Sequence, residues 1–529
     1  MKILVSDPIA DDGLELLREE HEVDVKTGLS EAELVDIIPG YDALVIRSGT
    51  KVTEKIINAA DRLKIVGRAG VGVDNIDVPA ATKKGIVVAN TPEGNTISAA
   101  EHTIAMMLAL SRNIPQANSS LKANEWNRKK FTGVEVRNKV LGTVGLGRVG
   151  IEVAKRAQGM EMKVIAYDPF IPAPRAKELG IELVDLDTLL RVSDYITVHT
   201  PLTDETRGMI SDSRFGMMKP GVRIINCARG GIIDEDALVR AVDGGKVAGA
   251  ALDVFVNEPP TGSPLLRPEN VIVTPHLGAS TEEAQVAVAV DVAKQVLAAL
   301  RDESVTTAIN LPQVRSDAMS VVAPYIALAE VLGSIVVQLI RKFDAIEITY
   351  TGRVFDTDLR MVTLAALKGV LSQSMGPTVN YVNAPAIAKE RKIKVKESKS
   401  IESDEVQSIT IGLSGGGESR TVTGALMGEG VHGAQGMRIL DIDGCKVDIA
   451  PSPYLIVSRH ENRPNIIGPC CMILGREEIN ISGMQVSEIG PDKRSIMILN
   501  VDSEVSDTIL DEVRTVDGVF DAEPVRLRL

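Results

Sequence analysis

Cysteine is scarce in this sequence. The 529 residues contain four cysteines, Cys227, Cys445, Cys470 and Cys471, and their spacing matches no metal-ligand motif. So few thiols are typical of a protein that folds in a reducing compartment, where disulfides do not persist. The sequence therefore predicts a cytoplasmic protein without a metal site.

An excess of positive charge is also missing. Lys and Arg together number 58, whereas Asp and Glu number 72, and the net charge is −14. Phosphate backbones and anionic membrane surfaces are bound by basic patches. The charge balance therefore argues against a nucleic-acid partner and against a membrane-surface partner, and it favours solubility.

Neither a targeting segment nor a membrane span is predicted. Residues 1–5 have the character of a β-strand rather than of a signal peptide. The longest apolar run, 321–340, contains Pro324, Glu330 and Gln338, which favours a packed or subunit-facing helix over a membrane span. A chain of 529 residues exceeds what one hydrophobic core can organise, so roughly three or four domains are expected.

The most informative stretch begins at residue 139. Residues 139–144 are apolar and β-branched, 151–157 have helical spacing, and the turn between them reads Gly145-Leu146-Gly147-Arg148-Val149-Gly150. In this context the first glycine permits a tight turn, the second admits a pyrophosphate, and the third lets helix and strand pack closely. The positive end of the helix then faces the phosphates. The stretch predicts dinucleotide binding.

An acid follows the next strand, 163–167, at Asp168. Its carboxylate can accept hydrogen bonds from the adenosine ribose, and it would repel a 2′-phosphate. The predicted cofactor is therefore NAD rather than NADP.

Short apolar strands alternate with helical stretches on both sides of this motif. They cover 3–6, 23–26, 43–46, 65–67 and 86–89, and later 195–199, 223–226, 249–252 and 271–274. This alternation predicts two doubly wound parallel-sheet α/β lobes with a cleft between them. A helix over 281–301 returns the chain to the first lobe. We call residues 1–97 plus 281–314 the substrate lobe, and residues 98–280 the nucleotide lobe.

Two loops at strand ends of the substrate lobe are candidate substrate contacts. They are the polar loop 47–50 and the glycine-rich loop 68–75, and ligands gather at the carboxyl ends of parallel strands. The glycines of the second loop also fit a plain turn. His102, within a predicted helix over 95–110, fits a satisfied helix residue better than a ligand.

The character of the sequence changes after residue 312. Residues 315–451 hold two predicted helices and several short strands, which indicates an α+β intervening domain. Its basic stretch 389–399 favours solvated surface, with an anion site as the alternative, and its glycine run 415–417 favours a loop. Residues 452–529 follow the order β-α-β-β-α-β of a ferredoxin-like module, predicted as a separate small domain.

Three polar residues follow strands of the nucleotide lobe, namely Arg229, Glu258 and His276. An arginine can hold a carboxylate bidentately, and a histidine can take a hydroxyl proton as hydride leaves the same carbon. A neighbouring carboxylate orients the histidine ring. Together the three predict oxidation of a 2-hydroxy acid. Singly, each also fits a structural role: Arg229 as a helix-capping charge, Glu258 as a loop acid and His276 as a loop histidine.

These residues and their surroundings resemble the D-2-hydroxyacid dehydrogenases. The resemblance is carried by the segments 68–75, 145–150, 199–203, 226–231, 252–255 and 274–279. The whole chain is similar to the long branch of that family, with an intervening domain, as at 381–385, and a C-terminal ACT module. This branch oxidises 3-phospho-D-glycerate to 3-phosphohydroxypyruvate with NAD, the first step of phosphorylated L-serine biosynthesis.

The resemblance implies a role for each site residue. Arg229 binds the substrate, Glu258 is the acid partner and His276 is the base. The residues expected at NAD are Val71, Gly145, Gly147, Arg148, Val149, Gly150, Asp168, Thr200, Cys227, Ala228, Arg229, Asp253, His276, Leu277, Gly278 and Ala279. The residues expected at the phosphorylated 2-hydroxy acid are Arg47, Val71, Gly72, Asn75 and Arg229.

The ACT module departs from its family in the ligand loop. The usual Asp-x-Pro-Gly is replaced by Asn462-Arg463-Pro464-Asn465, although Asn480 occupies the position of the ligand-binding asparagine. Asn462 lacks the negative charge for a ligand ammonium group, and Asn465 lacks the backbone freedom of glycine. We therefore expect weak inhibition by L-serine, bound at paired modules of a homo-oligomer, with a homotetramer as the expected assembly.

Two other functions fit parts of the sequence. A dehydrogenase for another D-2-hydroxy acid would use the same residues. An NAD-sensing corepressor shares the two-lobed fold and its three polar residues, but it would not be expected to carry an intervening domain and an ACT module.

Overall fold

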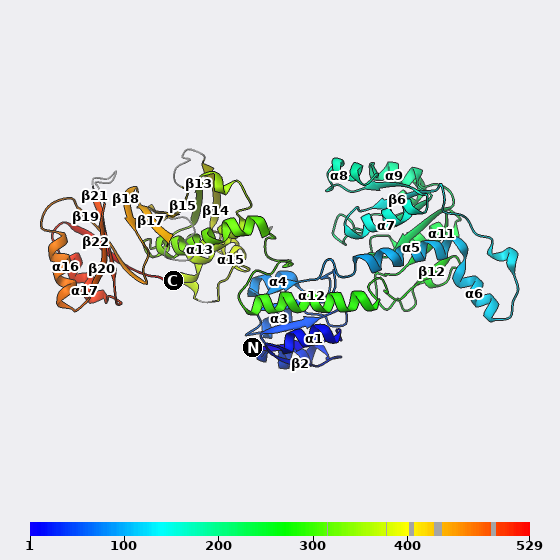
Figure 1. The fold of residues 1–529 in the computed structure, drawn as a ribbon, viewed down its shortest axis with the longest axis horizontal. Coiled ribbons are helices and arrows are strands. Elements are labelled where there is room, and N and C mark those ends of the chain that lie inside the picture. Colours follow the sequence, from blue (N-terminus) through cyan, green and yellow to red (C-terminus); the bar gives the residue numbers. More distant parts are fainter. Residues whose placement is uncertain (315, 377, 401–406, 428–435, 488–493, 529) are drawn as a thin grey trace.

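The computed structural model describes residues 1–314, 316–376, 378–400, 407–427, 436–487 and 494–528. Four β-sheets follow one another along this described part of the chain (Figure 1). The first two belong to the substrate and nucleotide lobes, and the last two form the C-terminal half of the protein. The domain boundaries given above stay predictions.

The substrate lobe is a five-stranded parallel sheet in the order β2-β1-β3-β4-β5. Its strands are β1 (Lys2–Val5), β2 (Glu22–Val25), β3 (Ala43–Ile46), β4 (Ile65–Arg68) and β5 (Val87–Ala89). Its helices are α1 (Asp11–Arg18), α2 (Glu31–Ile37), α3 (Glu54–Ala59) and α4 (Val78–Lys84). As predicted, α12 (Glu282–Leu300) returns to this lobe and packs on α1 and β4. Gly67 in β4 makes room for Val292 and Val296, because a Cβ there would lie 2.8 and 2.9 Å from their methyl groups.

The nucleotide lobe is a seven-stranded parallel sheet in the order β12-β11-β10-β9-β6-β7-β8. Its strands are β6 (Val140–Val144), β7 (Lys163–Tyr167), β8 (Glu182–Leu183), β9 (Tyr195–Val198), β10 (Val222–Asn226), β11 (Val247–Leu252) and β12 (Val271–Val273). The strand order reverses between β6 and β9, and ligands of such sheets bind at that switch point. The sequence did not predict β8, because a two-residue strand shows no periodicity.

The nucleotide lobe contains seven helices in the described residues. They are α5 (Thr96–Arg112), α6 (Ile114–Lys122), α7 (Arg148–Gly159), α8 (Ala173–Glu178), α9 (Leu186–Val192), α10 (Asp212–Met217) and α11 (Glu235–Asp243). Buried side chains lie on both sides of the sheet, in two hydrophobic clusters. The predicted pair of doubly wound α/β lobes is confirmed.

The third sheet has the order β14-β13-β15-β16-β17-β18. Its elements are α13 (Ser316–Gln338), β13 (Ala345–Thr351), α14 (Arg360–Met375), α15 (Ala384–Glu390), β14 (Lys394–Ser400), β15 (Ser408–Gly415), β16 (Glu418–Leu426), β17 (Met437–Ile442) and β18 (Cys445–Ile449). The prediction of two helices was wrong, because the seven-residue α15 is too short to show helical periodicity. Gly416 and Gly417 have φ angles of 60° and 84° and turn the hairpin between β15 and β16, so the predicted loop is confirmed.

Helix α13 contains a stretch, Ala318–Gln338, that is long and apolar enough to cross a membrane, with a mean hydropathy of 1.9. It instead packs along α14 and against β15 and β16. Gly369 of α14 permits the close approach, since a Cβ there would overlap the main chain of Glu330. This apolar run is therefore a core helix.

The basic stretch 389–399 leads into the exposed edge strand β14. Lysines on such an edge disfavour pairing with another chain.

The fourth sheet has the order β20-β21-β19-β22 and is antiparallel. Its elements, β19 (Tyr454–Glu461), α16 (Ile467–Arg476), β20 (Ile481–Val486), β21 (Arg494–Val501), α17 (Asp507–Arg514) and β22 (Val519–Arg526), confirm the predicted β-α-β-β-α-β order. However, Leu455, Val457 and Ile498 belong to the same hydrophobic cluster as α13 and β18. The module therefore shares a core with the intervening domain and is not separate, which strand periodicity alone could not indicate.

Candidate active site

The glycine-rich turn follows β6 and has the geometry that its sequence predicts. Gly145 has a φ angle of 95°, which favours glycine. Gly147 faces open space, with no atom within 4 Å of a Cβ placed on it, whereas a Cβ on Gly150 would overlap the carbonyl of Gly145. The second glycine therefore leaves room for a ligand, and the third packs the start of α7 against the turn.

Asp168 follows β7 and contacts this turn directly. Its Oδ2 accepts a hydrogen bond from the main-chain N–H of Leu146 at 2.7 Å, and its Oδ1 accepts one from Phe170 at 2.8 Å. The carboxylate therefore lies beside the open side of the turn, as expected of a ribose ligand, and it also fixes the turn. The ribose contact itself stays a prediction.

The other predicted cofactor residues follow β6, β9, β10 and β11. The buried hydroxyl of Thr200 has no hydrogen-bond partner among the described residues, so it is available to a ligand. Burial raises the pKa of Cys227 to about 12, so its thiol stays protonated. Arg148 begins α7 and lies 3.5 Å from a carboxylate oxygen of Glu93, while Val149 packs into the core of the lobe. The main-chain N–H of Ala228 donates to the side chain of Asn226.

Asp253 has no exposed surface. Its Oδ1 accepts a hydrogen bond from the main-chain N–H of Leu277 at 2.7 Å, and its Oδ2 accepts one from Gly278 at 2.8 Å. Ala279 follows in the same loop. In this structure Asp253 holds the loop that contains the predicted base.

His276 and Glu258 form a hydrogen-bonded pair at the end of the sheet. The Nδ1 of His276 lies 2.7 Å from Oε2 of Glu258, and Oε1 of Glu258 accepts a hydrogen bond from the N–H of Phe255 at 3.1 Å. Burial opposes the charge of Glu258, but the hydrogen bond and charge of His276 together with the hydrogen bond from Phe255 outweigh it and lower the pKa of this carboxyl. Because the ionised carboxylate can only accept, it holds the proton on Nδ1 and leaves the lone pair of a neutral ring on Nε2.

Arg229 follows β10 and bridges the two lobes. Its Nε donates to Oδ2 of Asp74 in the substrate lobe at 2.9 Å, and its Nη1 donates to the carbonyl of Ala228 at 2.6 Å. A Cβ on Gly72 would overlap the guanidinium, so the missing side chain lets Arg229 reach the loop. The structure therefore brings Arg229, Gly72 and the neighbouring Val71 together across the cleft.

Arg68, at the end of β4, joins this group; it opens the predicted substrate loop 68–75 but was not among the individually predicted site residues. Burial, followed by the charges of Arg229 and Arg47, lowers the pKa of Arg68 to about 10, so it remains cationic at neutral pH. Its Nε donates to Oδ1 of Asn75 at 2.8 Å. Three arginines thus share one end of the cleft, and the position of Arg68 at a strand end was the signal in the sequence.

Asn75 serves the structure of this cluster. Its Nδ2 donates to the main-chain carbonyls of Arg47 and Thr50, at 2.7 and 2.6 Å, while its Oδ1 accepts from Arg68. All these bonds join the two substrate-lobe loops to each other. The predicted contact of Asn75 with substrate stays a prediction, but its amide already holds Arg47 and Arg68 side by side.

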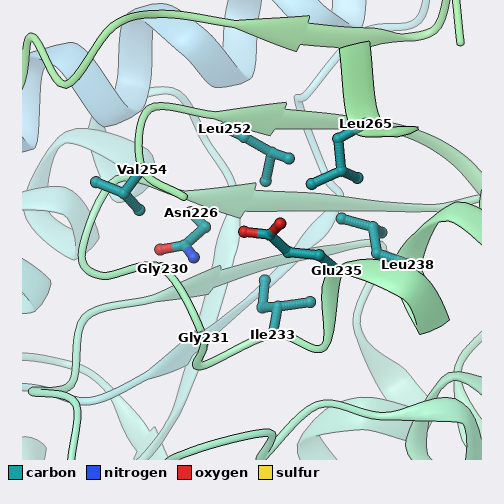
Figure 2. A pocket seen from close by; sticks show the side chains of 9 residues that line it. All are labelled: Asn226, Gly230, Gly231, Ile233, Glu235, Leu238, Leu252, Val254 and Leu265. Atoms are coloured by element: carbon teal, nitrogen blue, oxygen red, sulfur yellow. The ribbon is translucent and has the colours of Figure 1, made fainter. Parts of the chain in front are cut away.

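A small cavity lies beneath the Arg229 loop (Figure 2). It is lined by Asn226, Gly230, Glu235, Leu252 and Leu265, among others, and has a volume of about 10 Å³. This volume is close to the minimum for one water molecule and cannot hold a substrate. The cavity belongs to the support of the loop, and the candidate active site is the region where Arg229 meets Asp74 of the substrate lobe.

Two families match stretches of this chain. Residues 104–278 match the NAD binding domain of the D-isomer specific 2-hydroxyacid dehydrogenases, and residues 321–442 match the D-3-phosphoglycerate dehydrogenase intervening domain.

Relatives resemble the chain along its full length. The D-3-phosphoglycerate dehydrogenase of Synechocystis sp. is 49% identical over 529 residues, which are 99% of this chain and 95% of that relative. The D-3-phosphoglycerate dehydrogenase of Methanocaldococcus jannaschii is 44% identical over 529 residues, which are 100% of this chain and 100% of that relative. A solved D-lactate dehydrogenase from Aquifex aeolicus, complexed with NAD and lactic acid, is 30% identical with a TM-score of 0.53, over 57% of this chain and 96% of its own.

The geometry of His276 leads to a first prediction. His276→Ala should lower turnover of a D-2-hydroxy acid by about two to four orders of magnitude, because general-base catalysis typically supplies that factor. NADH binding should persist, since the glycine turn is unchanged. Steady-state NADH formation and NADH fluorescence titration measure the two effects. His21→Ala, at the amino end of β2, is the control. Near-normal turnover of His276→Ala would refute its role as base.

A second prediction concerns the choice of cofactor. Asp168→Ala should weaken binding of NADH much more than binding of NADPH, because the variant loses a ribose ligand and also a charge that repels a 2′-phosphate. Both affinities are measured by fluorescence titration. Asp168→Asn keeps one oxygen for the N–H groups around the turn, which separates loss of charge from loss of the turn. Equal losses for both cofactors in both variants would mean that Asp168 is not at the ribose.

Proposed function

The chain belongs to the D-3-phosphoglycerate dehydrogenase family, and from this premise we propose that Arg229, Glu258 and His276 carry its reaction in the cleft between the lobes. The reaction is the NAD-dependent oxidation of 3-phospho-D-glycerate to 3-phosphohydroxypyruvate, which opens the phosphorylated route to L-serine. The observation that carries the assignment of residues is the His276–Glu258 pair at 2.7 Å, on the same sheet edge as Arg229 and the glycine turn.

The residues present fit the cofactor. Gly147 leaves open space above the turn, and the buried hydroxyl of Thr200 has no partner among the described residues. Gly145, Gly150, Arg148 and Asp168 complete a surface for pyrophosphate and ribose. When bound there, NAD supplies the acceptor for a hydride.

The chain contributes the proton transfer and the orientation of the substrate. The lone pair on Nε2 of His276 takes the hydroxyl proton, and the carboxylate of Glu258 stabilises the resulting imidazolium. Arg229 holds the substrate carboxylate, for which the N–H groups of Val71 and Gly72 are close by. Nε of Arg229 already lies 2.9 Å from Oδ2 of Asp74, so the carboxylate of the substrate replaces the carboxylate of Asp74.

The phosphate end of the substrate is assigned to Arg47 and Arg68. Arg47 and Arg229 are close enough to Arg68 for their charges to lower its pKa. Arg229 is already assigned to the carboxylate of the substrate. A dianionic phosphate is the ligand that two further arginines match, since guanidinium groups bind phosphate bidentately. This cluster distinguishes a phosphorylated substrate from a plain D-2-hydroxy acid.

A test of the function combines a substrate panel with one variant. The protein should form NADH faster from 3-phospho-D-glycerate than from D-lactate or D-glycerate. Arg68→Gln should raise KM for the phosphorylated substrate by about 10- to 100-fold, because a hydrogen bond to a charged group contributes about 1.5–3 kcal/mol. For D-glycerate its kcat/KM should be unchanged. Arg62→Gln, which removes a partly buried ion pair with Asp42, is the matched control.

The panel also separates the alternatives. Faster turnover of an unphosphorylated D-2-hydroxy acid would favour the second dehydrogenase assignment. NADH binding without turnover of any member would favour an NAD-sensing binding protein.

We further propose that the protein is a homo-oligomer, with a homotetramer as the assembly. Helix α6 has no buried residue. We call residues 114–126 the arm, and its apolar residues Ile114, Leu121 and Trp126 have exposed fractions of 53, 56 and 76%. In Figure 1 this arm extends away from the body of the nucleotide lobe. An apolar surface of this kind is typical of a protein interface. Edge strands of the ferredoxin-like sheets supply a second possible contact between copies.

Trp126→Glu tests the arm. The variant should sediment as a smaller species than the parent protein, because a charge would be buried unpaired in the interface. Phe170→Glu, which changes an aromatic residue that is 91% exposed outside the arm, should leave the sedimentation coefficient unchanged. A Trp126→Glu variant that keeps the parental size would exclude the arm as an interface.

The ferredoxin-like module is proposed to bind L-serine in the cytoplasm as a weak inhibitor. Asn462 and Asn480 are both exposed. The lower backbone freedom expected at Asn465 does not prevent a glycine-like conformation, because Asn465 has a φ angle of 65° and lies in the left-handed region. Asparagine tolerates this conformation better than other side chains do. The missing charge at Asn462 remains the reason for weak binding.

The serine site is tested in the full-length protein, since the module shares a core with the intervening domain. L-Serine should inhibit the initial rate weakly, Asn480→Ala should abolish the inhibition, and Asn462→Asp should strengthen it by offering a charge to the ammonium group. Asp511→Asn, on α17, is the control. Potent inhibition that survives Asn480→Ala would exclude this site, and no inhibition at millimolar L-serine in any variant would exclude serine as the ligand.

A further inference from the structure

His102 lies in the second turn of α5, outside the sheet-edge loops that carry the residues assigned so far. Its Nε2 is 3.1 Å from Oγ1 of Thr274 and 3.2 Å from Oδ1 of Asp253, at the ends of β12 and β11. Its side chain is 19% exposed. The sequence favoured a satisfied helix residue over a ligand, and the partners of its Nε2 are on the sheet edge that carries the site.

The hydrogen bonds fix which atom carries the proton. Oγ1 of Thr274 donates its single proton to Oδ1 of Asp253 at 2.5 Å. The ionised carboxylate can only accept, so Nε2 of His102 must be the donor in this group. Burial opposes the charge of Asp253, but hydrogen bonds from His102, Thr274 and Leu277 outweigh it and lower the pKa of this carboxyl.

Asp253 in turn holds the main chain on both sides of His276. Its carbonyl accepts from the N–H of His276 at 2.9 Å, and its carboxylate accepts from Leu277 and Gly278. His276 itself has a φ angle of 55°, a left-handed conformation that costs about 1–3 kcal/mol in a residue other than glycine. These bonds hold the base in a conformation that it would not adopt by itself.

We propose that His102 is a positioning residue of this reaction: its N–H keeps the buried Asp253 carboxylate in place, and Asp253 keeps the His276 loop in its working conformation. The proposal rests on the function proposed above for His276. It places His102 in contact with Asp253 and Thr274 only, and it assigns no contact with substrate.

The test compares two substitutions of His102. His102→Ala should lower kcat by about 10- to 100-fold, because a misplacement of about 1 Å can cost 10²-fold in rate. KM and the Kd of NADH should change little. His102→Gln offers an amide N–H near the position of Nε2 and should restore most of kcat. Ser111→Ala, which removes a buried hydrogen bond to Tyr195 from the same helix, should lower Tm and leave kcat unchanged.

Hydrogen–deuterium exchange provides a measurement that does not depend on activity. The N–H groups of Leu277 and Gly278 should exchange faster in His102→Ala than in the parent protein and in Ser111→Ala. Parental kcat in His102→Ala, no rescue by His102→Gln, or unchanged exchange at 277 and 278 would each overturn the proposal. Absence of turnover in the parent protein would overturn the proposed function instead, while the exchange result would still decide whether His102 holds the loop.

Discussion

A carboxylate placed directly after a parallel strand, accepting main-chain N–H groups of nearby loops, recurs in both lobes. Asp7 follows β1 and binds the N–H groups of Arg47 and Thr50. Asp168 follows β7 and binds those around the glycine turn, and Asp253 follows β11 and binds those after His276. Hydrogen bonds to a charged group contribute about 1.5–3 kcal/mol each, so three carboxylates fix the three loops that form the cleft.

These anchors explain how a site can be built at the rim of a sheet. Loops at strand ends leave main-chain groups unpaired, and buried main-chain groups need partners. The carboxylates supply them from inside the fold, so the side chains of Arg47, Arg229 and His276 are not needed to hold these main-chain groups. Asn75 extends the same principle, because its amide joins the loops of Arg47 and Arg68.

The two lobes are joined by an ion pair at the residue that we propose for binding the substrate carboxylate. Arg229 of the nucleotide lobe is paired with Asp74 of the substrate lobe. If Arg229 binds the substrate carboxylate as proposed, one ion pair is exchanged for another, so the net gain in binding free energy is smaller than for an unpaired arginine. The pair also keeps the guanidinium oriented before substrate arrives, which reduces the ordering that binding requires.

The sequence by itself determined the features that depend on neighbouring residues. The glycine turn, the acid after β7, the alternation of strands and helices, and the polar residues Arg229, Glu258 and His276 after their strands are local patterns. Backbone freedom of glycine, strand periodicity and the common edge of parallel strands are enough to interpret them. Prediction from the sequence failed for short elements, as with β8 and α15, because they show no periodicity.

Only the tertiary structure decided which distant side chains meet. His102 and Thr274 are 172 residues apart in the chain, and Arg229 and Asp74 are 155 apart. Arg68 joins the arginine cluster because it is partly buried near the charges of Arg229 and Arg47. The ferredoxin-like module is not a separate domain because one face of its sheet packs in the same hydrophobic cluster as α13 and β18. Such contacts depend on side-chain direction and on what covers each face, and these are set by packing between segments rather than by local sequence.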